Sequence, residues 1–302
     1  MLHRDHRRLP ALPAARLARV NPEPTVRDLL QKARRRLAET PFGAPPREAG
    51  LLLGQVTGLS EAQILAHPER PVAAAAAARF GGLLERRLTG EPVAYLLGER
   101  EFYGRSFHVD RRVLIPRPET EHVVEVALAL GLQAGARIVD VGTGSGCLAV
   151  TLALELPGSW VLATDLSPGA LAVAAGNARR HGVEDRVHLV GADLLSGLDL
   201  SRCDLVVSNP PYIDVAEAPT LSPEVCNFEP HLALFSPGAG DSTLARLFEE
   251  SAGLPAGAAL VVEIGYGQLD AARRHASASS LHIAGTCKDY SGIPRALTLR
   301  RR

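Results

Sequence analysis

In the first third of the chain, hydrophobic positions recur at helical spacing. Between residues 25 and 88, apolar side chains fall three and four positions apart within short segments, which proline- and glycine-containing loops separate. Two segments open with a capping sequence, Thr25 with Asp28 and Ser60 with Gln63, in which each side chain can bond the backbone of the other residue. This pattern predicts a small bundle of short helices.

The spacing changes near residue 99 and again beyond residue 136. Extended residues on both sides of Gly104 predict a β-hairpin over residues 99–110, and Pro118 followed by Glu119 predicts a helix start. Short apolar runs then alternate with helical segments. The runs expected to form strands are 137–141, 160–164, 186–190, 204–208, 259–264, 281–286 and 294–299, and the helices expected between them include 147–154, 171–181 and 242–252.

This alternation predicts an α/β fold. Repeated strand–helix units form a parallel sheet with helices on both faces, and ligands bind such sheets at the carboxyl ends of the strands. A short loop that contains DYSGI (289–293) and no helix lies between the last two strands, so we expect these strands to form an antiparallel pair at one edge.

Composition excludes several classes of protein. The chain has 302 residues, of which 46% are hydrophobic and 22% charged, as in folded proteins. Thirty-three basic and 33 acidic residues leave a formal net charge of zero, which disfavours non-specific binding of nucleic acid. No apolar run approaches the roughly 20 residues that cross a bilayer. The four cysteines are widely separated, so we expect reduced thiols in a cytoplasmic protein, without a metal site.

A glycine-rich loop, DVGTGSG (140–146), follows the first strand of the alternating region. Glycine at every second position lets the backbone turn tightly and approach a ligand before the next helix. Asp165, at the end of the next strand, can accept hydrogen bonds from both hydroxyls of a ribose. The loop therefore predicts a cofactor that contains a nucleoside.

The spacing of this loop favours S-adenosylmethionine over a dinucleotide. The loop reads G-x-G-x-G, whereas the dinucleotide fingerprint is G-x-G-x-x-G. Asp140 precedes the first glycine, and its carboxylate would repel a pyrophosphate but suits an ammonium group. In the loop after the third strand, Asp193 can accept from an adenine amino group and Leu194 can pack on the adenine ring.

The motif SNPPY (208–212) closes the fourth strand at the same edge of the sheet. Pro210 and Pro211 remove two backbone donors. The chain corner formed by residues 209–212 therefore offers the Asn209 side-chain oxygen and the Pro210 carbonyl as acceptors. Such a corner can hold both hydrogens of a planar NH₂ group, and the ring of Tyr212 can stack on that group. We expect methyl transfer to an amino or amide nitrogen, with Asn209, Pro210 and Tyr212 as the catalytic residues.

The motifs and their order resemble those of the release-factor glutamine N5-methyltransferases, the HemK-type enzymes. The resemblance rests on residues 96–121, on DVGTGSG and SNPPYI, and on NFEPHLALF (227–235) and VVEIGYGQ (261–268). It implies a Rossmann-like S-adenosylmethionine-dependent methyltransferase sheet whose last strand is antiparallel, preceded by a small helical bundle and a β-hairpin linker. The domains expected are a flexible arm (1–22), a helical substrate-recognition domain (23–92), a hairpin linker (93–115) and a methyltransferase domain (116–302).

The resemblance also implies a substrate and site residues. The substrate would be the glutamine of the Gly-Gly-Gln loop in peptide chain release factors, with no direct role for nucleic acid or a membrane. Phe102, Tyr103 and residues 117–121 would shape the glutamine channel. By position, the cofactor contacts would be Gly142, Thr143, Gly144, Ser145, Gly146, Asp165, Leu194 and Asn209. The residues that hold the glutamine amide would be Asn209, Pro210, Pro211 and Tyr212.

Two alternatives remain open at this stage. A methyltransferase that acts on an exocyclic amine of adenine or guanine, in DNA or ribosomal RNA, could use the same corner because a purine NH₂ fits it. A DNA enzyme would need a basic target-recognition region and base flipping, and residues 25–100 are evenly charged. A non-catalytic adapter with this fold is disfavoured because Asp140, Asp165 and Asn209 are all present.

Overall fold

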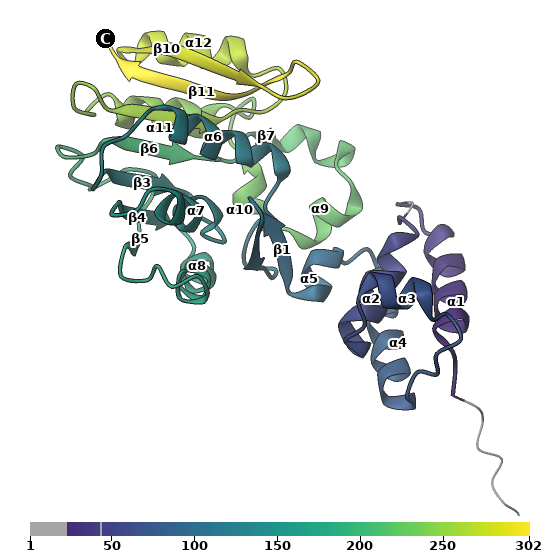
Figure 1. The fold of residues 1–302 in the computed structure, drawn as a ribbon. Helices are drawn as coiled ribbons and strands as arrows, with labels where there is room; N and C mark the ends of the chain where they lie inside the picture. Colours follow the sequence, from purple (N-terminus) through teal and green to yellow (C-terminus); the bar gives the residue numbers. More distant parts are fainter. Residues whose placement is uncertain (1–22, 43) are drawn as a thin grey trace, which may run out of the picture.

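The computed structural model describes residues 23–42 and 44–302, and its first part is a helical bundle (Figure 1). The predicted arm over residues 1–22 lies outside the described residues. Both predicted capping boxes are present: Thr25 and Asp28 bond each other's backbone over 3.0 and 3.2 Å, and Ser60 and Gln63 do the same. The helices of this part are α1 (Val26–Ala38), α2 (Arg47–Thr57), α3 (Glu61–Ala66), α4 (Ala74–Leu88) and α5 (Val93–Leu97).

Aliphatic side chains and one phenylalanine from these helices and their connecting segments share one hydrophobic core. The core consists of Val26, Leu30, Ala33, Leu37, Ala44, Ala49, Leu52, Leu53, Ile64, Val72, Phe80, Leu84 and Leu96. Burial of these apolar side chains stabilises helices that are too short to persist alone in water.

The predicted hairpin is formed by β1 (Glu99–Phe102) and β2 (Arg105–His108), which pair antiparallel. Its two turn residues, Tyr103 and Gly104, have φ of 51° and 70°, the left-handed conformation that tight hairpins require. Phe102 is 1% exposed and packs edge-on against Phe107, with ring centroids 6.1 Å apart. Phe102 therefore belongs to the hydrophobic core of the sheet, and its part in shaping the glutamine channel stays a prediction.

The alternating region forms a seven-stranded sheet in the order β10-β11-β9-β6-β3-β4-β5. Its strands are β3 (Arg137–Val141), β4 (Trp160–Asp165), β5 (Val187–Gly191), β6 (Leu205–Ser208), β9 (Ala259–Glu263), β10 (Leu281–Lys288) and β11 (Pro294–Arg301). Strand β11 runs antiparallel to β9 and β10, and the other neighbours are parallel. All seven predicted strands are confirmed, with ends that differ by at most two residues.

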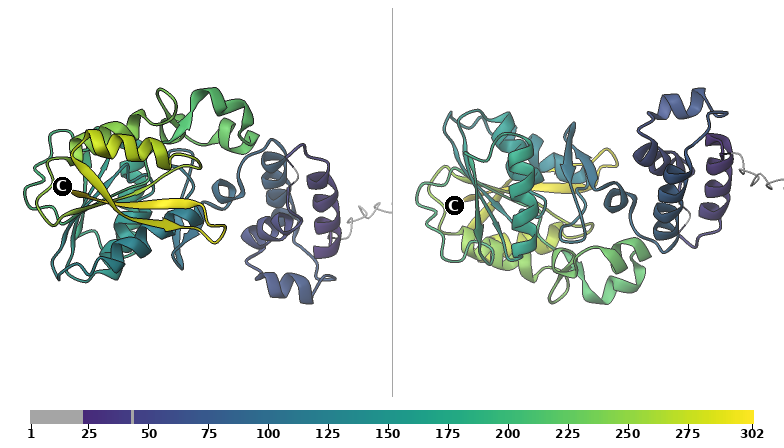
Figure 2. Two further views of the ribbon diagram at one scale, coloured as in Figure 1. Left: turned by 90° about the horizontal axis from the view of Figure 1, so that it is seen from above. Right: turned by 90° about the horizontal axis from the view of Figure 1, so that it is seen from below.

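Helices cover both faces of this sheet (Figures 1 and 2). Those on one face are α6 (Glu121–Ala129), α7 (Cys147–Glu155) and α8 (Pro168–Arg180), and those on the other are α11 (Ser242–Ser251) and α12 (Leu269–Ala278). Helix α8 begins three residues before its predicted start because Ser167 caps it and Pro168 occupies its first position. The fold is therefore an α/β sandwich with an antiparallel last strand, as predicted.

The strand register brings three chain segments together at the carboxyl edge of the sheet. In the parallel ladders Val141 aligns with Ser208, and Ser208 aligns with Val262. The residues that follow these positions, the glycine loop, Asn209 and Glu263, consequently lie next to one another. Strand order reverses at β3, which makes this edge the usual ligand site of a doubly wound sheet.

Short elements follow the SNPPY motif and reach toward the helical bundle (Figure 2). These elements are β7 (Ile213–Asp214), η2 (Val215–Thr220), α9 (Pro223–Phe228), α10 (His231–Leu234) and β8 (Phe235–Ser236). A further short element, the 3₁₀ turn η1 (Pro118–Thr120), lies directly before α6. Arg87 of α4 is 1% exposed and pairs with Glu48 of α2 and with Glu224 of α9. Arg111 also lies over the ring of Phe228, 4.8 Å from its centroid. Helix α9 thus contacts the bundle through Glu224 and the segment after the hairpin through Phe228.

Candidate active site

The glycine loop turns sharply between β3 and α7. Gly142, Gly144 and Gly146 all have positive φ, the backbone region that glycine tolerates best. Gly146 has a second constraint, because a Cβ built on it would lie 3.1 Å from the Cβ of Ala174 in α8. The Thr143 N–H donates to the Thr164 carbonyl over 2.8 Å, which fixes the loop against the end of β4.

Asp140 lies beneath this loop and is fully buried. Its Oδ2 accepts from the Thr143 hydroxyl over 2.6 Å and from the Ala149 N–H over 3.1 Å, so it ties the loop to the first turn of α7. Among the described residues, no donor reaches its Oδ1. Burial raises the pKa of Asp140 to about 7, and the Thr143 and Ala149 hydrogen bonds oppose that rise. A cation bound above the loop would favour the charged carboxylate.

Asp165 ends β4 and faces the loop. Its Oδ2 accepts from the Gly144 N–H over 2.9 Å, and its Oδ1 accepts from the Ser167 N–H over 2.8 Å. A carboxylate has about four acceptor positions, so each oxygen keeps one for a hydroxyl of a ligand. Ser167, whose hydroxyl oxygen accepts from the Ala170 N–H, caps α8, so Asp165 is not needed as the cap of that helix.

Asn209 is held by a chain of buried polar groups. Its Nδ2 donates to the Thr120 hydroxyl over 3.0 Å, and that hydroxyl donates to Glu263 Oε2 over 2.6 Å. The Tyr212 hydroxyl lies 3.5 Å from Glu263 Oε1, at the outer limit of a hydrogen bond. Thr120 precedes α6 and Glu263 ends β9, so three distant parts of the chain meet here.

Burial governs the titration of this chain of groups. Glu263 is 2% exposed, and desolvation raises its pKa to about 7. The Thr120 hydrogen bond lowers that pKa, and the charge of Glu119 raises it. The pKa of the Tyr212 hydroxyl is raised by burial first and then by the charge of Glu263, so Tyr212 stays neutral at physiological pH.

The backbone that follows β9 supports Tyr212. A Cβ on Gly265 would lie 2.8 Å from the Tyr212 ring, so only glycine leaves room for the ring there. Gln268 Nε2 donates to the carbonyls of Tyr212 and Gly240, over 3.0 and 3.1 Å. The segment VVEIGYGQ therefore positions the end of the SNPPY motif.

A small cavity lies between the glycine loop and Asn209. Its lining residues are Leu114, Pro116, Arg117, Thr120, Gly142, Thr143, Gly144, Ser145, Cys147, Leu148 and Asn209. Arg117 is oriented there by Glu229, whose carboxylate also accepts from the Ile115 N–H over 3.1 Å. Of residues 117–121 in the predicted channel, Arg117 and Thr120 thus line the cavity beside the loop.

The structure brings most of the predicted site residues to one edge. Residues 142–145 of the loop and Asn209 line the cavity, Asp165 bonds the loop, and Pro210, Pro211 and Tyr212 continue from Asn209. Gly146 does not line it and packs against Ala174 of α8. Leu194 has φ of 54°, and its half-buried side chain packs on the core of the α11–α12 face. Asp193 pairs with Arg246 over 3.0 Å at the surface.

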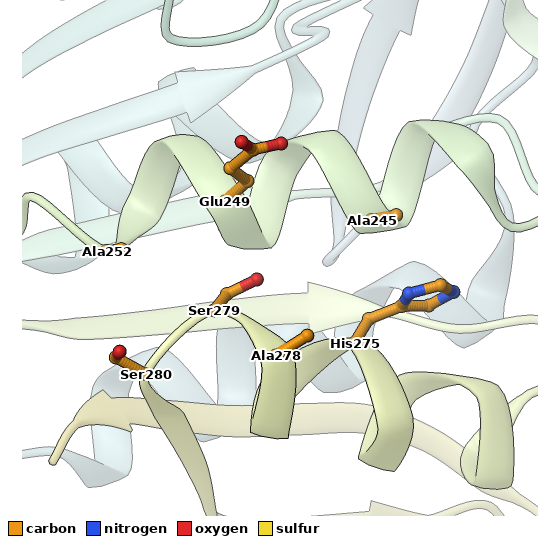
Figure 3. Close-up of a pocket in the computed structure, with 7 residues that line it drawn as sticks. All are labelled: Ala245, Glu249, Ala252, His275, Ala278, Ser279 and Ser280. Atoms are coloured by element: carbon orange, nitrogen blue, oxygen red, sulfur yellow. The ribbon is translucent and has the colours of Figure 1, made fainter.

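A larger hollow lies between α11 and α12, away from these motifs (Figure 3). Its lining residues are Ala245, Glu249, Ala252, His275, Ala278, Ser279 and Ser280. His275 already pairs with Asp241 over 2.9 Å. The hollow lies on a helical face, not at the carboxyl ends of the strands, and small side chains form most of it.

Four residues of the site went unrecognised as individuals in the sequence: Thr120, Glu229, Glu263 and Gln268. All four lie within segments that carry the family resemblance, and that is the signal by which they could have been found. Their bonds to Asn209, Thr120, Ile115, Arg117 and Tyr212 span 51 to 143 positions of the chain, beyond the reach of any local pattern.

Two further observations concern metals and membranes. Within residues 23–42 and 44–302, no group of three or more His, Cys, Asp or Glu residues could hold a metal ion. No helix in that part of the chain combines the length and apolar character needed to cross a membrane.

Comparison with known proteins assigns the class. A family model described as the PrmC N-terminal domain matches residues 28–98, and one described as the methyltransferase small domain matches residues 126–222. The catalytic domain of hMettl16 shares the fold, with a TM-score of 0.55 at 17% identity over 88% of this chain and 97% of that one. The chain is a methyltransferase, and its family and fold imply the use of S-adenosylmethionine.

Curated relatives specify the family. The release factor glutamine methyltransferase of Nitratidesulfovibrio vulgaris is 42% identical over 282 residues, which is 92% of this chain and 95% of the relative. That of Chlorobaculum tepidum is 48% identical over 223 residues, 70% of this chain and 76% of the relative. The chain belongs to the family of release factor glutamine methyltransferases.

Proposed function

We propose that the chain transfers a methyl group from S-adenosylmethionine to the side-chain amide nitrogen of the glutamine in the Gly-Gly-Gln loop of peptide chain release factors. The observation that carries this proposal is the juxtaposition of the glycine loop and Asn209 across one small cavity. The names of the relatives support the choice of substrate. The reaction would take place in the cytoplasm, where translation terminates.

The residues of the loop fit S-adenosylmethionine. We assign the cofactor contacts to residues 142–146, Asp165, Leu194 and Asn209. Asp165 keeps acceptor positions for the two ribose hydroxyls, and buried Asp140, with one oxygen unpartnered among the described residues, gives the site a negative charge. When bound, the cofactor supplies an electrophilic methyl group carried on a sulfonium ion.

The residues of the corner act on the substrate amide. Asn209 Oδ1 and the Pro210 carbonyl accept its two N–H groups, and Pro211 and Tyr212 line the flat face of the amide. An amide nitrogen is a weak nucleophile because its lone pair is delocalised into the carbonyl. Two acceptors that hold its hydrogens favour a pyramidal nitrogen whose lone pair points toward the cavity. Such positioning can supply up to about 7–11 kcal/mol.

Proton transfer needs no dedicated base before attack. The nitrogen becomes acidic once it carries the methyl group and can then release a proton to water. Tyr212 stays protonated at neutral pH, so it contributes its ring and not a phenolate.

We assign substrate recognition to the helical bundle over residues 23–92, with residues 93–115 as linker and residues 116–302 as the methyltransferase domain. The ion pairs of Arg87 with Glu48 and Glu224 support this assignment, because they connect the bundle to the segment that follows Tyr212. A protein held by the bundle would therefore lie close to the cavity.

The test compares three acceptors. The chain is incubated with methyl-labelled S-adenosylmethionine in three separate reactions, which contain purified release factor, duplex DNA or ribosomal RNA. We expect label on the release factor alone. Label confined to a nucleic acid would support an amine methyltransferase instead, and the absence of label on all three would favour a non-catalytic adapter.

A further inference from the structure

The carboxamide of Asn209 has two different ends, and only one suits the proposed reaction. Its oxygen can accept an N–H group of the substrate, whereas its NH₂ group would repel one. In the structure the nitrogen donates to the Thr120 hydroxyl over 3.0 Å, so the oxygen is the end that remains for the substrate.

The direction of that hydrogen bond is determined one residue further away. The Thr120 hydroxyl donates its single hydrogen to Glu263 Oε2 over 2.6 Å, a length typical of a bond from a hydroxyl to an ionised carboxylate. A hydroxyl that has donated its hydrogen can only accept from Asn209. Asn209 must then present Nδ2 to Thr120, and its oxygen stays on the opposite side.

Protonation of Glu263 would reverse the direction of both hydrogen bonds, from Glu263 to Thr120 and from Thr120 to Asn209. A neutral carboxyl can donate to Thr120, and the Thr120 hydroxyl can then donate to Asn209 Oδ1, which rotates the amide and withdraws the acceptor. The pKa of Glu263 is raised to about 7 by burial, lowered by the hydrogen bonds of Thr120 and Tyr212 and by Arg295, and raised by Glu119. Both directions of this hydrogen-bond chain are therefore accessible near neutral pH.

We propose that Glu263 is a positioning residue that acts through the Thr120 hydroxyl to orient the Asn209 carboxamide, so that Oδ1 faces the substrate nitrogen. The inference rests on the proposed function, since the substrate group is the amide NH₂. Glu263 itself does not touch the substrate. Its influence depends on being an acceptor, not on its volume.

That distinction defines the variants. Glu263→Gln keeps the shape of the side chain but can donate to Thr120, so it permits the reversed hydrogen-bond direction, in which Thr120 donates to Asn209. Thr120→Val keeps the volume and removes the connecting hydroxyl, and Thr120→Ser restores the hydroxyl. Each variant is compared with the parent chain by kcat and KM for purified release factor, by cofactor affinity from calorimetry, and by thermal unfolding.

We expect Glu263→Gln and Thr120→Val to lower kcat about tenfold or more, the effect of losing one oriented hydrogen bond in the transition state. KM for the release factor and the affinity for the cofactor should change less than about threefold. Thr120→Ser should retain most of the parent kcat. A purely structural role for Glu263 would instead change the unfolding temperature and both binding constants together.

The pH dependence gives a second readout. In the parent chain kcat should rise as pH increases through about 7, because Glu263 is protonated below that value and ionised above it. In Glu263→Gln this rise should be absent. Asp140, whose pKa is also raised to about 7, is present in both proteins and serves as an internal control.

The outcomes separate the inference from the proposed function. If the parent chain labels the release factor while Glu263→Gln and Thr120→Val match its kcat and pH profile, the inference is wrong and the proposed function stands. If the parent chain does not label the release factor at all, both are overturned.

Discussion

The glycine loop and the Asn209 corner lie side by side at one edge of the sheet, but different interactions hold them in place. The loop is fixed by partners close in sequence: Asp140 bonds Ala149 nine positions away, and Asp165 bonds Gly144 21 positions away. The corner is fixed by partners that are far away. Asn209 and Thr120 are 89 positions apart, and Thr120 and Glu263 are 143 positions apart.

This difference separates the two tasks of the site. Most of the part assigned to the cofactor is built from backbone turns at the ends of β3 and β4, two neighbouring strands with α7 between them, which an α/β sheet provides locally. The part assigned to the substrate depends on side chains from three separate segments, and these come together only when the sheet and α6 have assembled. Changes in the first part should affect cofactor affinity, and changes in the second should affect turnover.

Substitution of Asn209 should give the largest effect. Asn209→Ala removes the acceptor for the substrate nitrogen, and we expect kcat to fall on the order of a hundredfold or more. Cofactor affinity, measured by calorimetry, should stay within about threefold of the parent value, because Asn209 is only one of several assigned cofactor contacts and the loop does not depend on this side chain for its fold. An unchanged kcat would contradict the role assigned to Asn209.

Substitution of Asp165 should give an intermediate effect, and this effect should be on cofactor affinity and not on turnover. Asp165→Ala removes a charged acceptor for the ribose hydroxyls and the bond to Gly144, and we expect the cofactor dissociation constant to rise about tenfold or more. Turnover at saturating cofactor should change less than affinity does.

Asp199→Ala is the matched control for Asp165→Ala. Asp199 also accepts a bond from the backbone two residues further on, the Ser201 N–H, over 2.9 Å, but it lies at the surface. Its replacement should leave the dissociation constant unchanged. Equal effects of the two replacements, or none from Asp165→Ala, would remove the basis for the ribose assignment.

A pair of glycine replacements should give the smallest effect and tests how tightly the loop packs. Gly146 and Gly104 have φ of 80° and 70°, so alanine strains both positions by about 1 kcal/mol. Only at Gly146 would the added Cβ also meet a neighbour, the Cβ of Ala174 at 3.1 Å, whereas at Gly104 it meets open space. Gly146→Ala should therefore lower the free energy of unfolding by about 1 kcal/mol more than Gly104→Ala, measured in urea. Equal losses would show that α8 does not constrain the loop.

Features with a local signature could be predicted from the sequence. The seven strands follow from short apolar runs, the first helices from capping pairs such as Thr25 with Asp28, and the loop from its glycines. The register of parallel strands then explains why the loop and Asn209 meet.

Features that depend on burial and distant partners could not be predicted. Nothing near Glu263 in the sequence shows that it is buried beside Thr120, and the pairing of Arg87 with Glu224 joins residues 137 positions apart. The burial of Phe102 has no local signal either: the resemblance places this residue near the glutamine channel, and the hairpin turns its ring into the core.

The central claim is that this site methylates the side-chain amide of one glutamine. The most direct measurement is tandem mass spectrometry of release-factor peptides after incubation with the parent chain and S-adenosylmethionine. The account predicts one added methyl group, located on the side-chain nitrogen of the glutamine in the Gly-Gly-Gln loop, and none with Asn209→Ala. An added methyl on any other residue, or an unmodified loop, would contradict it.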